Sequence, residues 1–219
     1  MIVSRFPKEI FQRIFRSGVV ACATIENPLH AVPAARALAD GGIDVMELTL
    51  RTSNAVESLR RITAEVPEMI VGVGTILFPE QIHDVVAAGA AFGVAPGLSE
   101  RIVKTAQDAG LPFAPGIATP SELEKGIEYG CCEMKFFPAE GIGGIAYMKS
   151  MWTPYAHLGI RFIPMGGINP NNLPDYLREK MTLAIGGSWI VTQELLRTEN
   201  WQQIADAART AANIVSEVR

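Results

Sequence analysis

A repeated order of elements, in which a helix ends at a glycine and a short β-rich run follows, most constrains the fold of this chain. It occurs four times, with helix and strand at residues 34–42 and 45–50, 81–89 and 92–95, 102–110 and 112–114, and 121–130 and 133–137. Glycine at such a helix end supplies the positive φ that a C-terminal cap needs. Residues 19–24, 70–75, 161–165 and 182–185 are further strand candidates. Alternating β and α elements predict a parallel sheet in an α/β fold.

Eight such units in 219 residues predict a (β/α)8 barrel of the TIM type, near the lower end of its size range. The alternative is a doubly wound open sheet, but residues 19–28 lack the G-x-G-x-x-G glycines expected after its first strand. No linker divides the chain, so we expect one domain over residues 1–219. Apolar residues at helical spacing predict an extra N-terminal helix at about residues 7–16.

Composition excludes several classes of function. A formal charge of -4, without a cluster of basic residues, argues against nucleic acid, and no apolar run approaches the length of a membrane span. Charged side chains interrupt any signal peptide at the N-terminus. We expect a reduced, cytoplasmic protein whose Cys22, Cys131 and Cys132 serve only in packing. The three histidines form no ligand pattern, so we expect no metal and no other cofactor.

Lys135 is a cation in the middle of an apolar run, residues 133–138, that otherwise has the character of a buried strand. Lysine is almost never fully buried without a reason. Desolvation favours the neutral amine, which attacks a carbonyl carbon and forms a Schiff base. The alternative is a lysine that extends from a strand edge to solvent, and one buried lysine alone does not decide between them.

Polar side chains gather where the predicted strands end, which is where such barrels carry their function. Glu47 and Arg51 stand at alternate positions of the second strand and so share one face. Glu47 offers an acid or base, and Arg51 a bidentate contact for a carboxylate. The alternative is an ion pair between these two residues that only stabilises the barrel.

Two glycine pairs, 166–167 and 186–187, follow the last two predicted strands. Loops at these places often bind phosphate in barrels, through backbone N–H groups and a short helix N-terminus. Either pair alone would indicate a turn, but together they predict a phosphate site. With Lys135 and Glu47, they predict a class I aldolase acting on a phosphorylated 2-keto acid.

The motifs at the strand ends together resemble the family of 2-keto-3-deoxy-6-phosphogluconate (KDPG) and 4-hydroxy-2-oxoglutarate (KHG) aldolases. The resemblance covers nearly the whole chain, in segments 47–52, 72–75, 96–97, 115–117, 135–140, 166–168 and 186–189. It implies that Lys135 is the Schiff-base lysine and Glu47 the proton acceptor. It implies substrate binding by Arg51, Thr75, Pro96, Phe137, Met165, Gly166, Gly167, Gly187 and Ser188. The last four of these would hold the phosphate.

The resemblance also implies an Entner–Doudoroff enzyme of carbohydrate metabolism, assembled as a homotrimer, that releases pyruvate and glyceraldehyde 3-phosphate, or pyruvate and glyoxylate from KHG. Two departures stand out. Met165 replaces a threonine near the substrate C4 hydroxyl, as in the related phosphogalactonate aldolases, and the first strand has Ala21 to Thr24 where the family carries proline and aliphatics. The alternatives are a phosphogalactonate aldolase, an imine-free phosphosugar isomerase or epimerase, and a non-catalytic phosphometabolite-binding protein.

Overall fold

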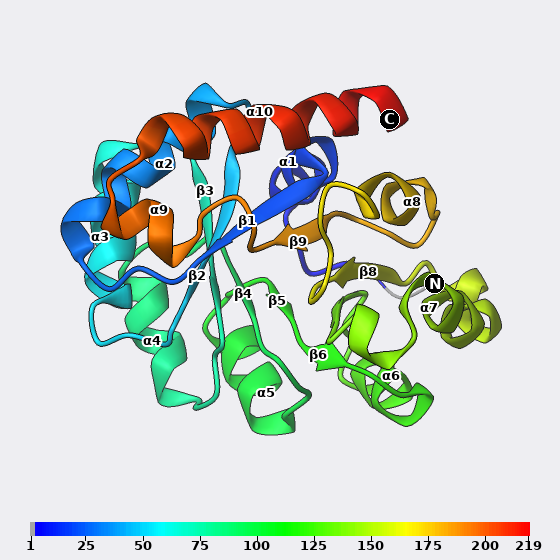
Figure 1. Cartoon of the computed structure of the whole chain (residues 1–219). Coiled ribbons are helices and arrows are strands. Elements are labelled where there is room, and N and C mark those ends of the chain that lie inside the picture. The colour runs from blue at the N-terminus through cyan, green and yellow to red at the C-terminus, as the bar shows by residue number, and fades with distance from the viewer. Residues whose placement is uncertain (1–2) are drawn as a thin grey trace.

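Parallel strands that curl around a common axis, with helices on their outer side, form the body of the protein (Figure 1). The computed structural model describes residues 3–219; Met1 and Ile2, which the predicted domain includes, lie outside the described residues. The strands are β1 Val19–Ala23, β2 Val45–Thr49, β3 Ile70–Gly74, β4 Phe92–Val94, β5 Phe113–Ala114, β6 Gly116–Ile117, β7 Glu133–Phe136, β8 Arg161–Pro164 and β9 Ile185–Gly187.

Helices alternate with these strands, as the sequence predicted. They are α1 Lys8–Ser17, α2 Ala31–Asp40, α3 Ala55–Glu65, α4 Glu80–Ala87, α5 Glu100–Asp108, α6 Pro120–Glu128, α7 Gly144–Trp152, α8 Leu173–Arg178, α9 Gln193–Arg197 and α10 Trp201–Val218, with 3-10 turns η1 Pro28–His30, η2 Glu140–Ile142 and η3 Thr153–Leu158. Gly42, Gly89, Gly110 and Gly130 follow α2, α4, α5 and α6 with φ between 69 and 90°. The predicted glycine caps and the N-terminal helix are confirmed. Within residues 3–219, no helix combines the length and the apolar character that crossing a membrane requires.

Hydrogen bonding divides the strands into two parallel sheets, in the orders β5-β4-β3-β2-β1-β9 and β6-β7-β8. The consecutive order has no reversal, which excludes the doubly wound alternative. The fifth predicted strand, residues 112–114, is followed by a break at Pro115, which has no N–H to donate and separates β5 from β6. At the other junction only single bridges, Phe162 to Thr182 and Met165 to Gly186, join the sheets. The α/β class is confirmed, but the sheet is not the single uninterrupted barrel that the sequence predicted.

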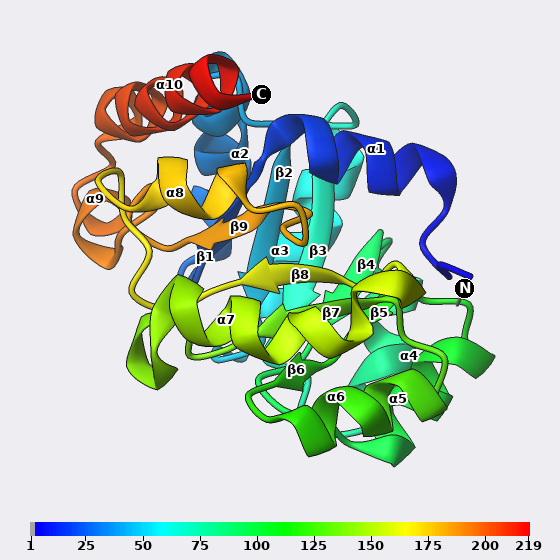
Figure 2. The ribbon, with the colours of Figure 1, turned by 90° about the vertical axis from the view of Figure 1, so that its right-hand side faces the viewer.

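Apolar side chains fill the inside of the curled sheet at the end where the strands begin. This inner cluster takes one or two residues from most strands and includes Val20, Val45, Phe92 and Ile163. Helix α1 adds Ile14 to it and lies across the same end of the sheet (Figure 2). Arg13 of α1 is anchored 2.9 Å from Asp44, just before β2. Polar chemistry is therefore left to the opposite end, where the strands finish.

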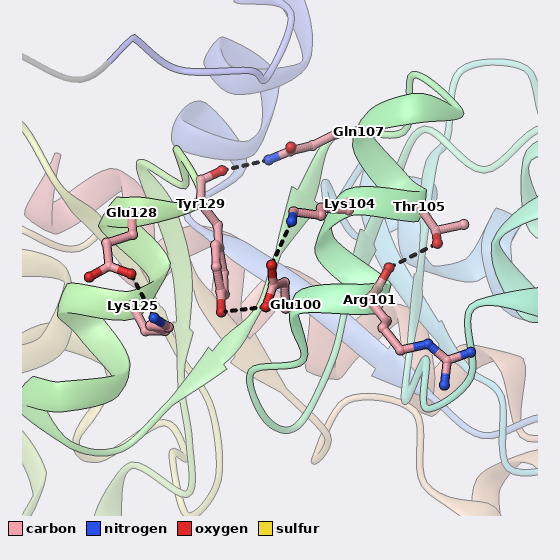
Figure 3. A network of polar contacts seen from close by, with 8 residues as sticks. All are labelled: Glu100, Arg101, Lys104, Thr105, Gln107, Lys125, Glu128 and Tyr129. Carbon is pink, nitrogen blue, oxygen red and sulfur yellow. Dashed lines mark hydrogen bonds and ion pairs between the residues drawn. The ribbon is translucent and has the colours of Figure 1, made fainter.

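The outer faces of α5 and α6 are joined by a network of polar side chains (Figure 3). Glu100 accepts hydrogen bonds from Lys104 at 2.5 Å and from the Tyr129 hydroxyl at 3.2 Å. Gln107 donates to the Tyr129 carbonyl at 2.7 Å. Such exposed contacts add little to stability. The network therefore orders side chains on the outer surface and takes no part in the interior of the sheet.

Glu133 is the first residue of β7, at the end of the sheet that the apolar cluster and α1 fill. It carries a buried carboxyl group and is 3 % exposed. Burial raises the pKa of Glu133, against the opposing influence of a hydrogen bond from Ser4 and the charge of Arg161. The folded state therefore keeps the Glu133 proton to a higher pH than the unfolded chain, whose ordinary value is 4.5. Stability falls as the pH rises above that value, because the folded state then binds more protons than the unfolded state.

We predict that Glu133→Gln increases the free energy of unfolding more at pH 7 than at pH 4. Glutamine keeps an oxygen for Ser4 but cannot ionise, so it removes a penalty that exists only above the unfolded-state pKa. Urea unfolding of both proteins at the two pH values measures the difference. An equal effect at both would show that ionisation of Glu133 does not affect stability.

Candidate active site

Lys135 and Glu47 meet inside the curled sheet. The Lys135 Nζ lies 3.8 Å from the Glu47 Oε1, and the two side chains are only 8 % and 2 % exposed. Lys135 comes from β7 and Glu47 from β2, which belong to different sheets. The lysine is thus buried as the sequence predicted, and it does not extend to solvent from an edge strand.

A missing side chain makes room for the Glu47 carboxylate. If Gly74 carried a Cβ atom, that atom would lie 1.6 Å from the Glu47 Oε1. Gly74 ends β3 and is paired with Thr49 of β2, so the glycine stands directly beside the carboxylate. Any larger residue at position 74 would displace Glu47 from its place opposite Lys135.

Cys22 holds the other side of the carboxylate. Its Sγ lies 3.6 Å from the Glu47 Oε2, as a weak donor on the neighbouring strand β1. Burial, and next the Glu47 charge, raise the pKa of the Cys22 thiol, so it stays protonated. The prediction that all three cysteines serve only in packing is therefore wrong for Cys22. Its place on the inward face of β1, two residues after Val20, was a signal that sequence reasoning could have used.

Two threonine hydroxyls lie one step nearer to the open end. Thr24 and Thr49 follow Cys22 and Glu47 by two residues, and their Oγ1 atoms are 2.7 Å apart. Strand alternation in the sequence places Thr49 on the same face as Glu47, and the same argument would have placed Thr24 on the inner face as well.

Arg51 lies in the turn after β2 and is exposed. Among the ion pairs of residues 3–219, Glu47 is matched with Lys135 and not with Arg51, so the alternative of a purely internal pair is wrong. The Arg51 charge still acts on the Cys22 thiol, whose pKa it lowers in opposition to Glu47. The guanidinium is thus within electrostatic reach of the buried groups, and it is free to meet a ligand.

Three more predicted residues surround Lys135 or end a nearby strand. The Phe137 ring centre lies 5.1 Å from the Lys135 Nζ. Pro96 approaches the strand that pairs with Lys135, because a Cβ atom on Gly116 would lie 2.2 Å from the Pro96 carbonyl oxygen. Thr75 follows β3 with φ at 60°, which is unusual for a β-branched residue and typical of functional loops.

The two glycine pairs lie side by side, because the bridge between Met165 and Gly186 aligns the ends of β8 and β9. Gly166 and Gly167 form the loop after β8, but Gly186 and Gly187 belong to β9 itself, so the prediction that the second pair follows its strand is wrong. Gly166 and Gly167 have φ of 96 and 84°. Within residues 3–219, the N–H groups of Gly166, Gly167 and Ser188 donate to no protein acceptor. Three unpaired backbone donors at one place suit an anion.

Met165 closes the space beneath these loops. It is 4 % exposed and packs on Gly186, where an added Cβ atom would lie 2.4 Å from the Met165 Cγ. The structure therefore brings Lys135, Glu47 and Phe137 together and sets the glycine loops beside each other at the same open end. Such an arrangement can hold a phosphorylated ligand, and it offers an amine and a carboxylate to a carbonyl group.

The family model "KDPG and KHG aldolase" matches residues 10–207. The chain is similar to the KHG/KDPG aldolase of Escherichia coli (strain K12), with 46 % identity over 193 residues, which is 88 % of this chain and 90 % of that protein.

Solved structures agree with this similarity. KDPG aldolase from Legionella pneumophila, with pyruvate captured at low pH as a covalent carbinolamine intermediate, has a TM-score of 0.87 and 37 % identity, and covers 92 % of this chain and 97 % of its own. The 2-keto-3-deoxy-6-phosphogluconate aldolase of Zymomonas mobilis ZM4 with 3-phosphoglycerate has a TM-score of 0.84 and 35 % identity, and covers 92 and 93 %.

The contact between Cys22 and Glu47 predicts how fast the thiol reacts. Burial and then the Glu47 charge raise the pKa of Cys22, and Glu47→Gln removes the second of these, so iodoacetamide at pH 8 should label Cys22 faster in this variant. Peptide mass spectrometry measures each thiol separately. Cys131, whose pKa burial raises to about 12 without a contribution from Glu47, serves as the internal control and should label at an unchanged rate. Equal Cys22 rates in both proteins would contradict the contact.

Proposed function

The chain belongs to the KDPG and KHG aldolase family, and from this membership we propose that it is a class I aldolase that cleaves KDPG to pyruvate and glyceraldehyde 3-phosphate. Such an enzyme is a carbon–carbon lyase. The observation that carries the proposal is the buried Lys135, with its Nζ 3.8 Å from a carboxylate oxygen. We propose KHG, which yields pyruvate and glyoxylate, as a second substrate, in keeping with the relative named for both.

Lys135 is the proposed nucleophile. Its neutral amine adds to the C2 carbonyl of the substrate, and loss of water from the resulting carbinolamine leaves an iminium ion. When the C3–C4 bond breaks, the electron pair moves to the iminium nitrogen, and a pyruvate enamine remains on Lys135. Protonation of the enamine at C3 and addition of water then release pyruvate and restore the amine.

Glu47 is the proposed acid and base. Its Oε1 faces Lys135, so the carboxylate is placed to move protons during imine formation. In the cleavage step it takes the proton of the C4 hydroxyl, directly or through one water. The hydrogen bond from Cys22 to the Oε2 keeps the other oxygen in place meanwhile.

The remaining residues bind the two ends of the substrate. We assign the pyruvyl carboxylate to Arg51, with Thr75, Pro96 and Phe137 around it, because Arg51 is a free guanidinium at the open end. The phosphate is assigned to the backbone of Gly166, Gly167, Gly187 and Ser188. Met165 is buried between these groups. It presents a thioether, and not a hydroxyl, to the substrate C4, and this weakens the selectivity between the two C4 epimers.

We also propose a closed (β/α)8 barrel over the whole chain as one domain. The Leu183 N–H donates to the Phe162 carbonyl at 2.8 Å, beside the two bridges, and this supports closure between β8 and β9.

A homotrimer is proposed from the family resemblance, and the exposed Leu77 and Phe78 before α4 offer an apolar surface for subunit contact. From the family resemblance we also propose a role in the Entner–Doudoroff pathway. The free cysteines fit a reducing compartment such as the cytoplasm.

Borohydride trapping tests the imine directly. Incubation with pyruvate and borohydride should add a reduced pyruvyl group to Lys135, located by peptide mass spectrometry, because borohydride reduces the iminium ion to a stable amine. Lys135→Ala should show no adduct and no cleavage of KDPG, with an unchanged circular dichroism spectrum. Lys149→Ala, which removes an exposed lysine of α7, is the matched control and should behave as wild type. A wild-type protein without an adduct at saturating pyruvate would overturn the proposal.

Gly74→Ala should reduce kcat/KM for KDPG by roughly a hundredfold, since the new methyl group pushes Glu47 out of position. Glu47→Gln should cost about the same, which is the usual scale for a general base. Gly126→Ala is the control, because the atoms nearest to its methyl group all belong to the Met134 side chain, whose Sδ would lie at 2.8 Å and whose end can turn aside. Pyruvate release, coupled to lactate dehydrogenase, measures all three variants. Full activity in Gly74→Ala would remove the requirement for an exact Glu47 position.

A further inference from the structure

A hydrogen bond between Glu140 and Tyr176 connects the loop after the Lys135 strand to the helix after the first glycine loop. The Tyr176 hydroxyl donates to the Glu140 Oε1 at 2.5 Å. Tyr176 lies in α8 and is fully buried, whereas Glu140 begins η2 and is exposed. Burial, and next Glu140, raise the pKa of Tyr176, so its hydroxyl remains a donor at any physiological pH.

The backbone of the first glycine loop rests on Glu140. The Glu140 N–H donates to the Gly166 carbonyl at 3.0 Å. A Cβ atom on Gly167 would lie 2.6 Å from the Glu140 Cβ, so the two segments are in close contact. A shift of the Glu140 backbone or of its Cβ would therefore displace the Gly166 and Gly167 peptides.

The opposite side of the loop is held by Asn172, whose Nδ2 donates to the Gly167 carbonyl at 3.2 Å. The loop is thus fixed between Glu140 and Asn172, with Gly166 and Gly167 in left-handed conformations. With this geometry, the N–H groups of both glycines have no acceptor among the described residues 3–219.

A carboxylate beside a phosphate site is unfavourable for direct contact with the anion, because like charges repel. The Glu140 carboxylate is instead occupied by the Tyr176 hydroxyl. Glu140 accepts from the buried Tyr176 hydroxyl and does not face the ligand. It therefore suits a positioning residue, which acts through the Gly166 and Gly167 backbone beside it.

We propose that the Glu140–Tyr176 pair is a latch that positions the Gly166 and Gly167 N–H groups for the phosphate, and that it thereby sets the preference for phosphorylated over unphosphorylated 2-keto acids. The inference rests on the proposed aldolase function, whose two substrates differ at the end remote from C2: KDPG ends in a phosphate, whereas KHG is shorter and ends in a carboxylate. Among residues 3–219, neither latch residue is hydrogen-bonded to Lys135 or Glu47. The latch therefore affects one substrate and spares the other.

The test compares the two substrates in Tyr176→Phe, which removes a single oxygen atom. The KM for KDPG should rise roughly tenfold, the scale of one lost hydrogen bond to a charged group, while kcat and KM for KHG stay as in wild type. Inhibition of KHG cleavage by inorganic phosphate should weaken by a similar factor. An equal change for both substrates, or no change for either, would overturn the latch.

Matched variants separate the latch from a general loss of stability. Tyr155→Phe removes another tyrosine–glutamate hydrogen bond, 2.7 Å to Glu124 on the outer surface, and should alter neither substrate. Glu140→Gln keeps an acceptor for Tyr176 and should restore most of the KDPG affinity that Glu140→Ala loses. If Tyr176→Phe fails to fold, the two Glu140 variants decide the same question.

Pyruvate trapping on the same proteins distinguishes the two levels of the proposal. Wild type and Tyr176→Phe should both form the Lys135 adduct, since pyruvate has no phosphate. If both proteins form the adduct and the ratio of KDPG to KHG cleavage is unchanged, the latch alone is contradicted. If wild type forms no adduct and cleaves neither substrate, the aldolase function is contradicted, and the latch with it.

Discussion

A lysine and a glutamate buried face to face inside the curled sheet are the constraint on which the rest of the structure depends. Loss of either partner leaves an unpaired charge in a buried place, which costs about 3–5 kcal/mol. The fold accommodates the pair by placing apolar and polar side chains at opposite ends of the curled sheet. Apolar residues and α1 close the end where strands begin, and Gly74 leaves space for Glu47.

The same arrangement fits the two ends of the ligand that we propose. Arg51 is exposed and Glu47 is paired with Lys135, while Glu140 and Asn172 hold the carbonyls of Gly166 and Gly167. The Arg51 guanidinium and the N–H groups of Gly166 and Gly167 therefore remain available to a ligand. The site is therefore built before the ligand arrives, which lowers the cost of binding.

Much of this could be predicted, but not all. The Lys135 strand and the glycine caps were visible because burial and positive φ leave local signals in the sequence. Cys22 was missed because a thiol beside a carboxylate depends on which strands are neighbours. The split at Pro115 was missed since pairing across a break is decided by several strands together. The alternative of an ion pair between Arg51 and Glu47 is excluded because Glu47 pairs with Lys135. Lys135 comes from the other sheet and lies 84 residues after Arg51 in the sequence.

The sequence by itself determined the α/β class, the order of elements and the chemical groups at the strand ends, because periodicity, caps and residue types are local properties. Only the tertiary structure decided which groups meet. The contact of Glu47 with Lys135 and Cys22, the space left by Gly74 and the bond from Tyr176 to Glu140 all join residues at least 25 positions apart. Such contacts follow from how the strands curl and register, which no local pattern records.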